Sequence, residues 1–199
     1  ANVSITKIST KKDLEKLAKR KPDLVFSGVK YFNFNSKKIW LNDYLEKYDI
    51  PYIASGKIAL DNESDKNKAK KLMLKSNVKT ADFFITTPED HQNVSSIPIS
   101  FPLFIKPIKG GDSRGIDANS IVYNFSSFKE KVLDIKKKYN LPSLVETYLP
   151  GKEYSVGIFQ NSINKNLIAM PIEIIVRKNI NGHCILDFDV KKNDKETVI

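Results

Sequence analysis

A short apolar segment that ends in a lysine and runs into a glycine-rich turn carries the most specific chemistry in this sequence. Pro102-Leu103-Phe104-Ile105-Lys106-Pro107 has the composition of a buried strand, and Gly110-Gly111-Asp112-Ser113-Arg114-Gly115 follows closely. Glycines permit positive φ angles, and successive backbone amides in such a turn form an anion-binding nest. Together with the Lys106 ammonium and the Ser113 hydroxyl, these amides suit a polyphosphate. A strand, a solvated lysine and a hairpin turn without any ligand remain the alternative.

The spacing around Lys106 fits neither the Walker loop nor the dinucleotide-binding fingerprint. The GxxxxGK[ST] pattern is absent, and residues 120–123 after the turn indicate a strand where both loops require a helix. A nucleotide at this segment would therefore be held by strands and a flexible hairpin, with lysines closing on its phosphates.

A second group of residues, Leu144 to Tyr154, could hold the rest of a nucleotide. Val145, Tyr148 and Leu149 offer an apolar slot for a planar base, and an extended linker exposes backbone N–H and C=O groups to it. Glu146 and Glu153 are acceptors for an exocyclic amine or a ribose hydroxyl pair. Two surface glutamates that flank a Pro-Gly turn remain the alternative.

These segments need helices and strands to position them, and the hydrophobic periodicity predicts both. We expect helices at Lys11–Arg20 after a Thr10 cap, at Lys37–Tyr48, from a Ser64 cap to a stop at Asn77, and at Ser127–Tyr139. We expect strands at 3–8, 24–29, 50–53, 82–86, 102–107, 120–123, 143–147, 153–159, 167–176 and 183–189.

The N-terminal alternation of helices and strands indicates the end of a doubly wound α/β sheet whose opening units are missing. The apolar run Leu24–Val29 is typical of a parallel strand that is buried on both faces. The polar loop Pro88–Ser100 suggests a junction between subdomains.

Composition limits the class of protein. With 41% hydrophobic and 28% charged residues, the chain resembles an ordinary soluble globular protein. No apolar run approaches the roughly 20 residues that span a bilayer, so we expect no membrane contact. The single cysteine, Cys184, cannot form an internal disulfide, which favours a reduced, cytoplasmic setting.

The net charge of +10 leaves two classes of partner open, polyphosphates and nucleic acids. Of the 33 basic residues only Arg20, Arg114 and Arg177 are arginine, the residue that usually reads base edges. The lysines also do not interleave with aromatic residues in one compact motif. A basic nucleic-acid-binding module is therefore the weaker alternative.

Four blocks in order resemble the ATP-grasp superfamily, and its D-alanine–D-alanine ligase branch most of all. Pro51 to Gly56 resembles "IPYTGSG", Ser64-Asp65-Lys66 with Leu72 to Leu74 resembles "MDK…LLL", Phe104 to Pro107 with the glycine-rich turn resembles "VVKP…GSSxG", and Val145 to Gly157 resembles "VEEYIPGREYTVG". The similarity covers roughly Asp23 to Lys191.

The resemblance implies a role for each matching residue in binding ATP. Lys66 and Lys106 would contact phosphates, Gly111 and Ser113 would cover the β- and γ-phosphates as a movable lid, and Lys191 would touch the terminal phosphate. Phe104 and Leu149 would sandwich the base, Glu146 would accept from its amino group, Tyr148 and Leu149 would offer backbone groups, and Glu153 would hold the ribose. For Lys191 a solvated lysine remains the alternative.

The resemblance also implies a division of the chain, α/β overall and α+β within the ATP-grasp part. Residues 1–62 would be the C-terminal part of a pre-ATP-grasp α/β domain. Residues 63–148 would be the small ATP-grasp subdomain with the glycine-rich loop, and residues 149–199 an incomplete second subdomain.

The implied activity is an ATP-dependent carboxylate–amine ligase that forms an amide through an acyl-phosphate, as in peptidoglycan synthesis. The partners would be ATP, a small carboxylate and an amine, and a homodimer is left open. Magnesium would be needed, but we expect its Asp, Glu and Asn ligands outside this chain. Because the metal half and the opening units are missing, we expect a fragment, a split subunit or a non-catalytic ATP-grasp piece that is inactive alone.

The substrate residues depart from the D-alanine ligase pattern. Asp112 stands at the first position of the serine pair, and Lys192 stands where the family has a tyrosine. D-Alanine is therefore not assigned as the substrate.

Overall fold

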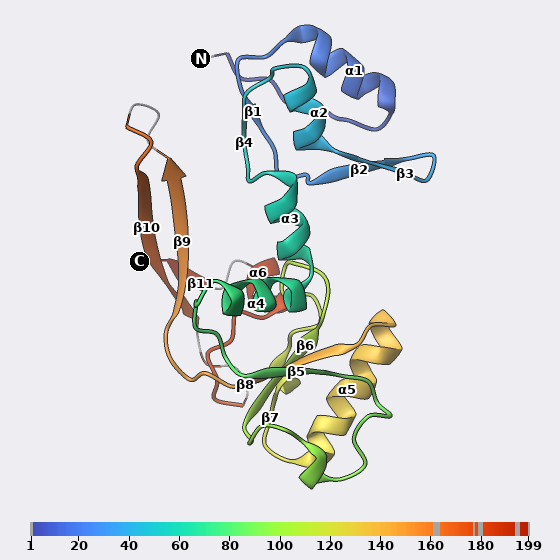
Figure 1. Ribbon diagram of the computed structural model, residues 1–199, viewed down its shortest axis with the longest axis vertical. Helices are drawn as coiled ribbons and strands as arrows, with labels where there is room; N and C mark the ends of the chain where they lie inside the picture. The colour runs from blue at the N-terminus through green and yellow to red at the C-terminus, as the bar shows by residue number, and fades with distance from the viewer. Residues whose placement is uncertain (1, 161–163, 177, 179–180, 194–195, 199) are drawn as a thin grey trace. The chain divides into compact units, whose positions relative to one another are not determined.

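The computed structural model describes residues 2–160, 164–176, 178, 181–193 and 196–198. The chain forms two compact units, Ala1–Glu63 and Ser64–Ile199. Figure 1 shows the elements of each unit with their labels. No described helix is both long enough and apolar enough to cross a membrane.

Two of the three helices of the first unit contribute buried residues to its core, and short strands pack against them. Its elements are α1 (Lys11–Arg20), β1 (Val25–Phe26), β2 (Tyr31–Phe34), β3 (Lys37–Trp40), α2 (Leu41–Lys47), β4 (Tyr52–Ile53) and α3 (Lys57–Ser64). Thr10 and Asp13 cap α1 reciprocally, as a capping box. Strands β1 and β4 pair in parallel, and the core consists of Leu14, Leu17, Ala18, Leu41, Leu45 and Ile50.

Several predictions for this unit are wrong, and hairpin pairing explains one of them. Residues 3–8 form no strand. The predicted helix Lys37–Tyr48 begins only at Leu41, because Lys37–Trp40 pairs with Tyr31–Phe34 around a turn in which Asn35 and Ser36 have positive φ. The predicted doubly buried strand is short, and Phe26 is 82% exposed.

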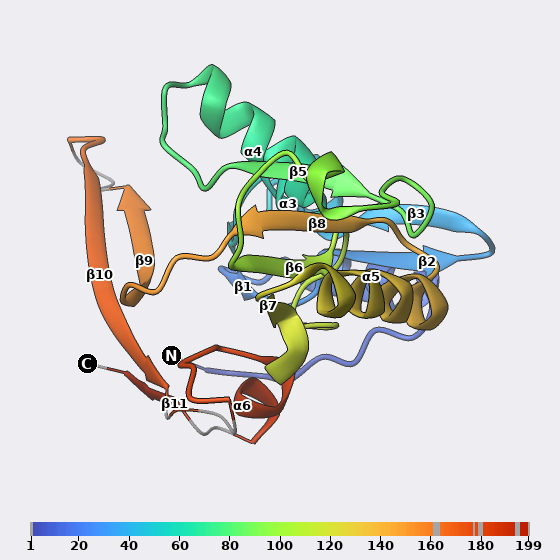
Figure 2. The ribbon, with the colours of Figure 1, turned by 90° about the horizontal axis from the view of Figure 1, so that it is seen from below.

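The second unit is built on a four-stranded antiparallel sheet in the order β5-β8-β6-β7. Its strands are β5 (Phe83–Thr86), β6 (Leu103–Pro107), β7 (Ile121–Val122) and β8 (Ser143–Thr147). Helix α5 (Phe125–Tyr139) packs along this sheet (Figure 2). The core between them comprises Leu103, Ile105, Val122, Phe128, Val132, Ile135 and Val145.

The remaining elements of this unit are helices and a second sheet. They are α4 (Lys66–Lys75), the 3₁₀ turns η1 (Val94–Ser96) and η2 (Ala118–Ser120), and α6 (Phe188–Lys192). Strands β9 (Glu153–Gln160), β10 (Leu167–Val176) and β11 (Glu196–Val198) form a three-stranded antiparallel sheet in the order β11-β10-β9.

Three further predictions are corrected here. Helix α4 is capped by Asp65, which accepts from two backbone N–H groups, and not by Ser64, which ends the unpredicted α3. The loop Pro88–Ser100 connects two strands of one sheet, so it is not a subdomain junction. Residues 183–187 form no strand, and α6 follows them.

Candidate functional site

Three side chains of the predicted site share one face of the four-stranded sheet. Phe104 lies opposite Glu146 in the pairing of β6 with β8, and Lys106 follows Phe104 by two positions. Since side chains alternate across a strand, Phe104, Lys106 and Glu146 project from the face that does not carry the α5 core. Ile105 and Val145 pair on the opposite face, within that core.

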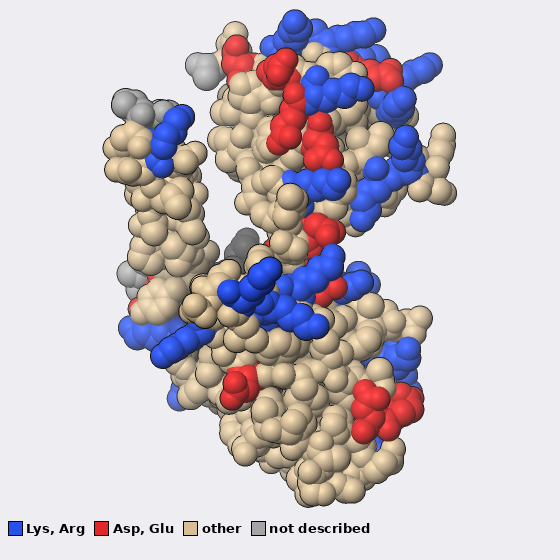
Figure 3. Space-filling model, viewed as in Figure 1, with Lys and Arg blue, Asp and Glu red and all other residues tan. Residues whose placement is uncertain are grey.

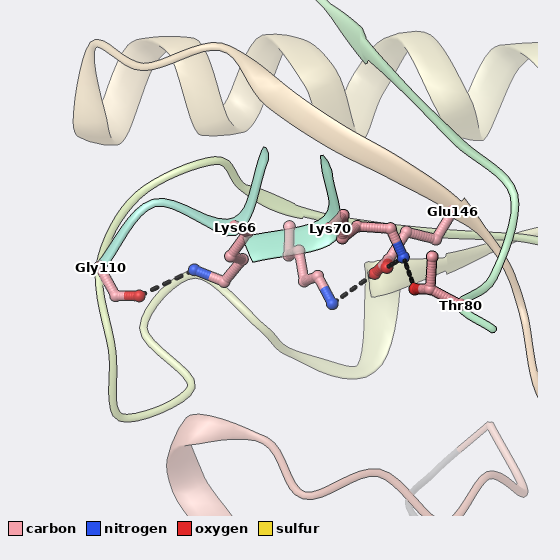
Figure 4. Close-up of polar contacts among 6 residues, drawn as sticks. Lys66, Lys70, Thr80, Gly110 and Glu146 are labelled. Atoms are coloured by element: carbon pink, nitrogen blue, oxygen red, sulfur yellow. Dashed lines mark hydrogen bonds and ion pairs between the residues drawn. The ribbon is translucent and has the colours of Figure 1, made fainter. Parts of the chain in front are cut away.

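Two lysines converge on the buried carboxylate of Glu146. Lys70 Nζ, from α4, donates to Oε1 at 2.5 Å, and Lys106 Nζ, from β6, makes an ion pair with Oε2. Lys70 also donates to Thr80 Oγ1 at 2.6 Å, as Figure 4 shows. The side chains of Lys70 and Glu146 are 8% and 11% exposed, so this charge cluster is largely removed from water.

The cluster controls the protonation of Glu146. Burial on its own raises the pKa of this carboxyl, but the charge and hydrogen bond of Lys106, and then those of Lys70, outweigh burial. The net result is a pKa below the ordinary value, so the carboxylate stays ionised at neutral pH. An ionised carboxylate only accepts hydrogen bonds.

A cleft of about 720 Å³ opens beside this cluster, between the face of β6 and β8 and the strands β9 and β10. This volume is within the range of small-molecule sites, which is roughly 300–1,000 Å³. Six of the predicted ligand residues line it: Phe104, Lys106, Glu146, Tyr148, Leu149 and Glu153. The remaining charged groups of the lining are Lys70, Lys79, Lys152 and Glu173.

Lysines also gather on the surface of α4, where Figure 3 shows them together. Lys68, Lys71 and Lys75 are exposed on this helix, whereas Lys70 is buried. Only Lys70 of α4 reaches the cleft.

Lys66, one helical turn before Lys70, lies against the glycine-rich loop and not in the cleft lining. Its Nζ donates to the carbonyl oxygen of Gly110 at 2.8 Å (Figure 4), and its backbone N–H donates to Ile108 O at 3.0 Å. The N–H of Gly110 in turn donates to Ser64 O. The start of α4 and the start of the loop are therefore joined.

The loop itself has the backbone that the sequence indicates. Gly110, Asp112, Ser113 and Gly115 all have positive φ. Gly115 is required twice over, because its φ is +82° and a Cβ there would lie 2.4 Å from Pro107 Cγ. The Ser113 hydroxyl donates to the carbonyl oxygen of Leu186 at 2.6 Å, which ties the loop to the segment before α6.

The linker after β8 differs in detail from its expected role. The N–H of Tyr148 donates to Pro102 O at 3.1 Å, so this donor is already engaged within the fold. Burial, followed by the charges of Tyr123 and Cys184, raises the pKa of the Tyr148 phenol. Leu149 is 66% exposed at the cleft edge, where an apolar ligand face could cover it.

Lys191 is not among the residues that line the cleft. It is exposed on α6, whose first N–H, from Phe188, donates to Ile116 O at 3.3 Å. The segment of Lys191 thus runs beside the glycine-rich loop, although Lys191, Gly111 and Ser113 do not line the cleft.

Sequence reasoning missed Lys70, the most deeply placed cation of the site. Several lysines occupy α4, and composition alone does not single one out. The available signal was spacing, since residues four apart lie on one helix face and Lys70 follows Lys66 by four.

No metal centre is identified in the part of the chain that the structure describes. There, no three His, Cys, Asp or Glu side chains gather closely enough to hold a metal ion.

Comparisons with known proteins identify the family of the chain. The sequence profile described as "D-ala D-ala ligase C-terminus" matches residues 72–199. A D-alanine–D-alanine ligase of Clostridium botulinum is 34% identical over 128 residues, which cover 64% of this chain and 41% of that protein. One of Rickettsia typhi is 26% identical over 178 residues, covering 89% of this chain and 50% of that protein.

Solved structures show the same fold. A D-alanine–D-alanine ligase from Bacillus anthracis complexed with ATP superposes with a TM-score of 0.60 and 20% identity, over 96% of this chain and 57% of that one. The VanG D-Ala:D-Ser ligase from Enterococcus faecalis gives a TM-score of 0.56 at 20% identity, over 76% of this chain and 43% of that one. At these identities the likeness concerns the fold alone.

The extent of these matches sets the scope of the assignment. The chain spans 41% to 50% of the length of the two relatives named above. The profile match covers well over half of the chain, and the neighbouring structures share its α+β architecture. The chain belongs to the D-alanine–D-alanine ligase family and has an ATP-grasp fold.

Proposed function

We propose that the cleft beside Glu146 binds ATP, and that the chain supplies the ATP-binding part of an ATP-dependent carboxylate–amine ligase. The observation that supports this most is the pairing of Lys70 and Lys106 on one buried carboxylate, at the wall of a cleft of about 720 Å³. The domain division at 62 and 148 is part of the same proposal.

The base would lie at the end of the cleft that Phe104 and Leu149 line. Ring stacking and apolar contact would hold its faces. Glu146 would accept from the amino group, and the backbone beyond the engaged N–H of Tyr148 would offer further groups. Glu153 at the start of β9 would accept from the ribose hydroxyls.

The phosphates would extend from Lys106 toward the glycine-rich loop. Lys106 is the more exposed of the two lysines on Glu146, at 20% against 8% for the Lys70 side chain. Lys66, the amides near Gly111 and the Ser113 hydroxyl would follow, and Lys191 beside the loop would reach the terminal phosphate. Ser113 would first have to release the carbonyl of Leu186.

The reaction proposed for the whole protein is phosphoryl transfer followed by acyl transfer. A carboxylate oxygen attacks the γ-phosphorus, the bond to the bridging oxygen breaks, and ADP leaves. An amine then attacks the acyl carbon, loses a proton and displaces inorganic phosphate. The lysines of this chain would orient the triphosphate and offset its negative charge.

Magnesium would neutralise charge between the phosphates in this chemistry. Its carboxylate and amide ligands are proposed to lie outside this chain. Asp112 and Lys192 depart from the family pattern, so the carboxylate and the amine are proposed only as small molecules. A cytoplasmic role in peptidoglycan synthesis and a homodimer belong to the same proposal.

Calorimetric titration with ATP, with and without magnesium, tests the proposed site. We expect Lys106→Ala and Glu146→Gln each to weaken ATP binding about tenfold or more, which corresponds to about 1.4 kcal/mol. Lys137→Ala is the matched control, because Lys137 is exposed on α5, behind the sheet. Equal affinities for wild type, Lys106→Ala and Glu146→Gln would show that the site is wrong.

A further inference from the structure

Lys70 is a buried cation that the roles proposed above leave unused. Lys70 as a whole residue is 6% exposed, and its ammonium lies 4.9 Å from the centre of the Phe83 ring. Removing an ammonium from water is energetically costly unless partners compensate it. The partners here are Thr80 and Glu146, so the position of Lys70 is tied to that carboxylate.

The two lysines of Glu146 differ in what they can do when a nucleotide enters. Lys106 has the more exposed side chain and lies on the strand that leads to the glycine-rich loop. It can therefore turn toward a phosphate. Lys70 has a second anchor in Thr80, so it can stay on Oε1 and keep Glu146 compensated while Lys106 is engaged elsewhere.

The fixed, ionised state of Glu146 has a consequence for the choice of base. A carboxylate accepts hydrogen bonds and donates none, so it pairs with a 6-amino group and repels a 6-oxo group. A protonated carboxyl would tolerate both. Discrimination at this position thus depends on the group that keeps the carboxylate charged.

We propose that Lys70 is a positioning residue for base selectivity, which holds Glu146 as a fixed acceptor and so favours 6-amino over 6-oxo purine nucleotides. The inference rests on the proposed function. The other charged groups that line the same cleft are the cations Lys79 and Lys152 and the anions Glu153 and Glu173. None of these contacts Glu146 among the ion pairs of the described residues.

The test compares ATP with inosine triphosphate, which differs at the 6-position and keeps the ribose and triphosphate of ATP. Dissociation constants are measured by calorimetry between pH 5.5 and 8 for wild type, Lys70→Met and Lys71→Met. Lys71 is the matched control because it neighbours Lys70 on α4 and is exposed. Thermal melts establish that each variant is folded.

In wild type and Lys71→Met we expect ATP to bind about 10- to 100-fold more tightly than inosine triphosphate, the factor that one hydrogen bond to a charged group provides. This ratio should be constant over the pH range. In Lys70→Met it should fall below about threefold, and it should fall further as the pH is lowered, since Glu146 then takes up a proton. If the role of Lys70 were merely structural, the substitution would weaken the binding of both nucleotides equally and leave the ratio of their affinities unchanged.

The outcomes separate the two proposals. If wild type binds neither nucleotide, the proposed function fails. If wild type prefers ATP and Lys70→Met keeps the same ratio at every pH, only the role of Lys70 is overturned. If wild type binds both nucleotides equally, the role of Lys70 and the contact of Glu146 with the amino group are both overturned, while ATP binding in the cleft stands. If Lys70→Met does not fold, two other variants replace it. Lys70→Arg should keep the wild-type ratio of the two affinities, and Thr80→Val, which removes the second anchor of Lys70, should lower that ratio severalfold. Equal ratios in wild type, Lys70→Arg and Thr80→Val overturn the inference.

Discussion

At the scale of single residues, the account depends on Glu146 and its two lysines. A buried carboxylate with one ammonium on each oxygen is a costly arrangement that must be compensated within the cluster. Its depressed pKa means that the folded state binds a proton less readily than the unfolded chain does. The cluster therefore contributes stability above the ordinary carboxyl pKa, and this contribution is lost as the pH falls through the lowered pKa.

Glu146→Gln should reveal this contribution. At pH 7 we expect the free energy of unfolding to fall by about 3 kcal/mol, because buried Lys70 and partly buried Lys106 lose their counter-ion. The gap between wild type and variant should narrow as the pH falls from about 4.5, the ordinary glutamate pKa at which the unfolded chain takes up a proton, through the lowered pKa of Glu146 in the folded protein. Urea denaturation across this pH range measures it. Glu130→Gln, on the exposed side of α5, should follow wild type, and a gap that stays constant with pH would contradict the account.

At this scale the sequence predicts the strand residues of the site well and the helix residue poorly. Alternation fixes which side Phe104, Lys106 and Glu146 share once their strands are identified. Lys70 depends on the rotation of α4 over the sheet, which tertiary packing determines and local pattern does not.

At the scale of elements, most of the long periodic segments were predicted to within two residues, and the helix predicted at Lys37–Tyr48, which begins only at Leu41, is an exception. Helix α1 and strand β10 match their predicted bounds, and α5 begins two residues early, at Phe125. The errors fall on short segments, such as β3 and the residues before α6, where four or five positions cannot distinguish a strand from a helix turn. Pairing with a distant or neighbouring strand decides those cases.

The turn between β6 and η2 offers a prediction at this scale. Gly115→Ala should destabilise the protein by about 3 kcal/mol or more, since it adds a methyl group against Pro107 at an unfavourable φ. Gly110→Ala is the matched control, because Gly110 also has a positive φ but would place its Cβ in open space. The control should cost only about 1 kcal/mol. Urea unfolding of both variants measures the difference, and equal losses would show that the contact with Pro107 is not limiting.

At the scale of the whole molecule, the chain has two separate hydrophobic cores and a net charge of +10. Strands β9 and β10 expose apolar side chains from both faces of their sheet, such as Val156, Ile158, Ile168 and Met170. Strands with apolar residues on both sides are typical of sheets that are buried on both faces. Charge and apolar surface at this scale describe the molecule in general and do not locate its site.

The net charge predicts weak binding to any polyanion. A single-stranded oligonucleotide should bind with an affinity that falls steeply with salt, since its binding releases counter-ions. Lys106→Ala and Lys137→Ala should weaken this binding slightly and equally, while only Lys106→Ala weakens ATP binding. Fluorescence anisotropy at several salt concentrations measures the oligonucleotide affinity. Loss of oligonucleotide binding in Lys106→Ala alone would favour a nucleic-acid site in the cleft instead.

The most direct test of the ATP cleft is a nitrogen-15 NMR titration of the labelled protein with ATP. We predict that the amide signals that shift most belong to residues 104–106, 110–115 and 146–153, and that Lys106→Ala suppresses these shifts. Saturating shifts confined to Ala1–Glu63, or shifts spread evenly over exposed lysines, would contradict an ATP site at Glu146.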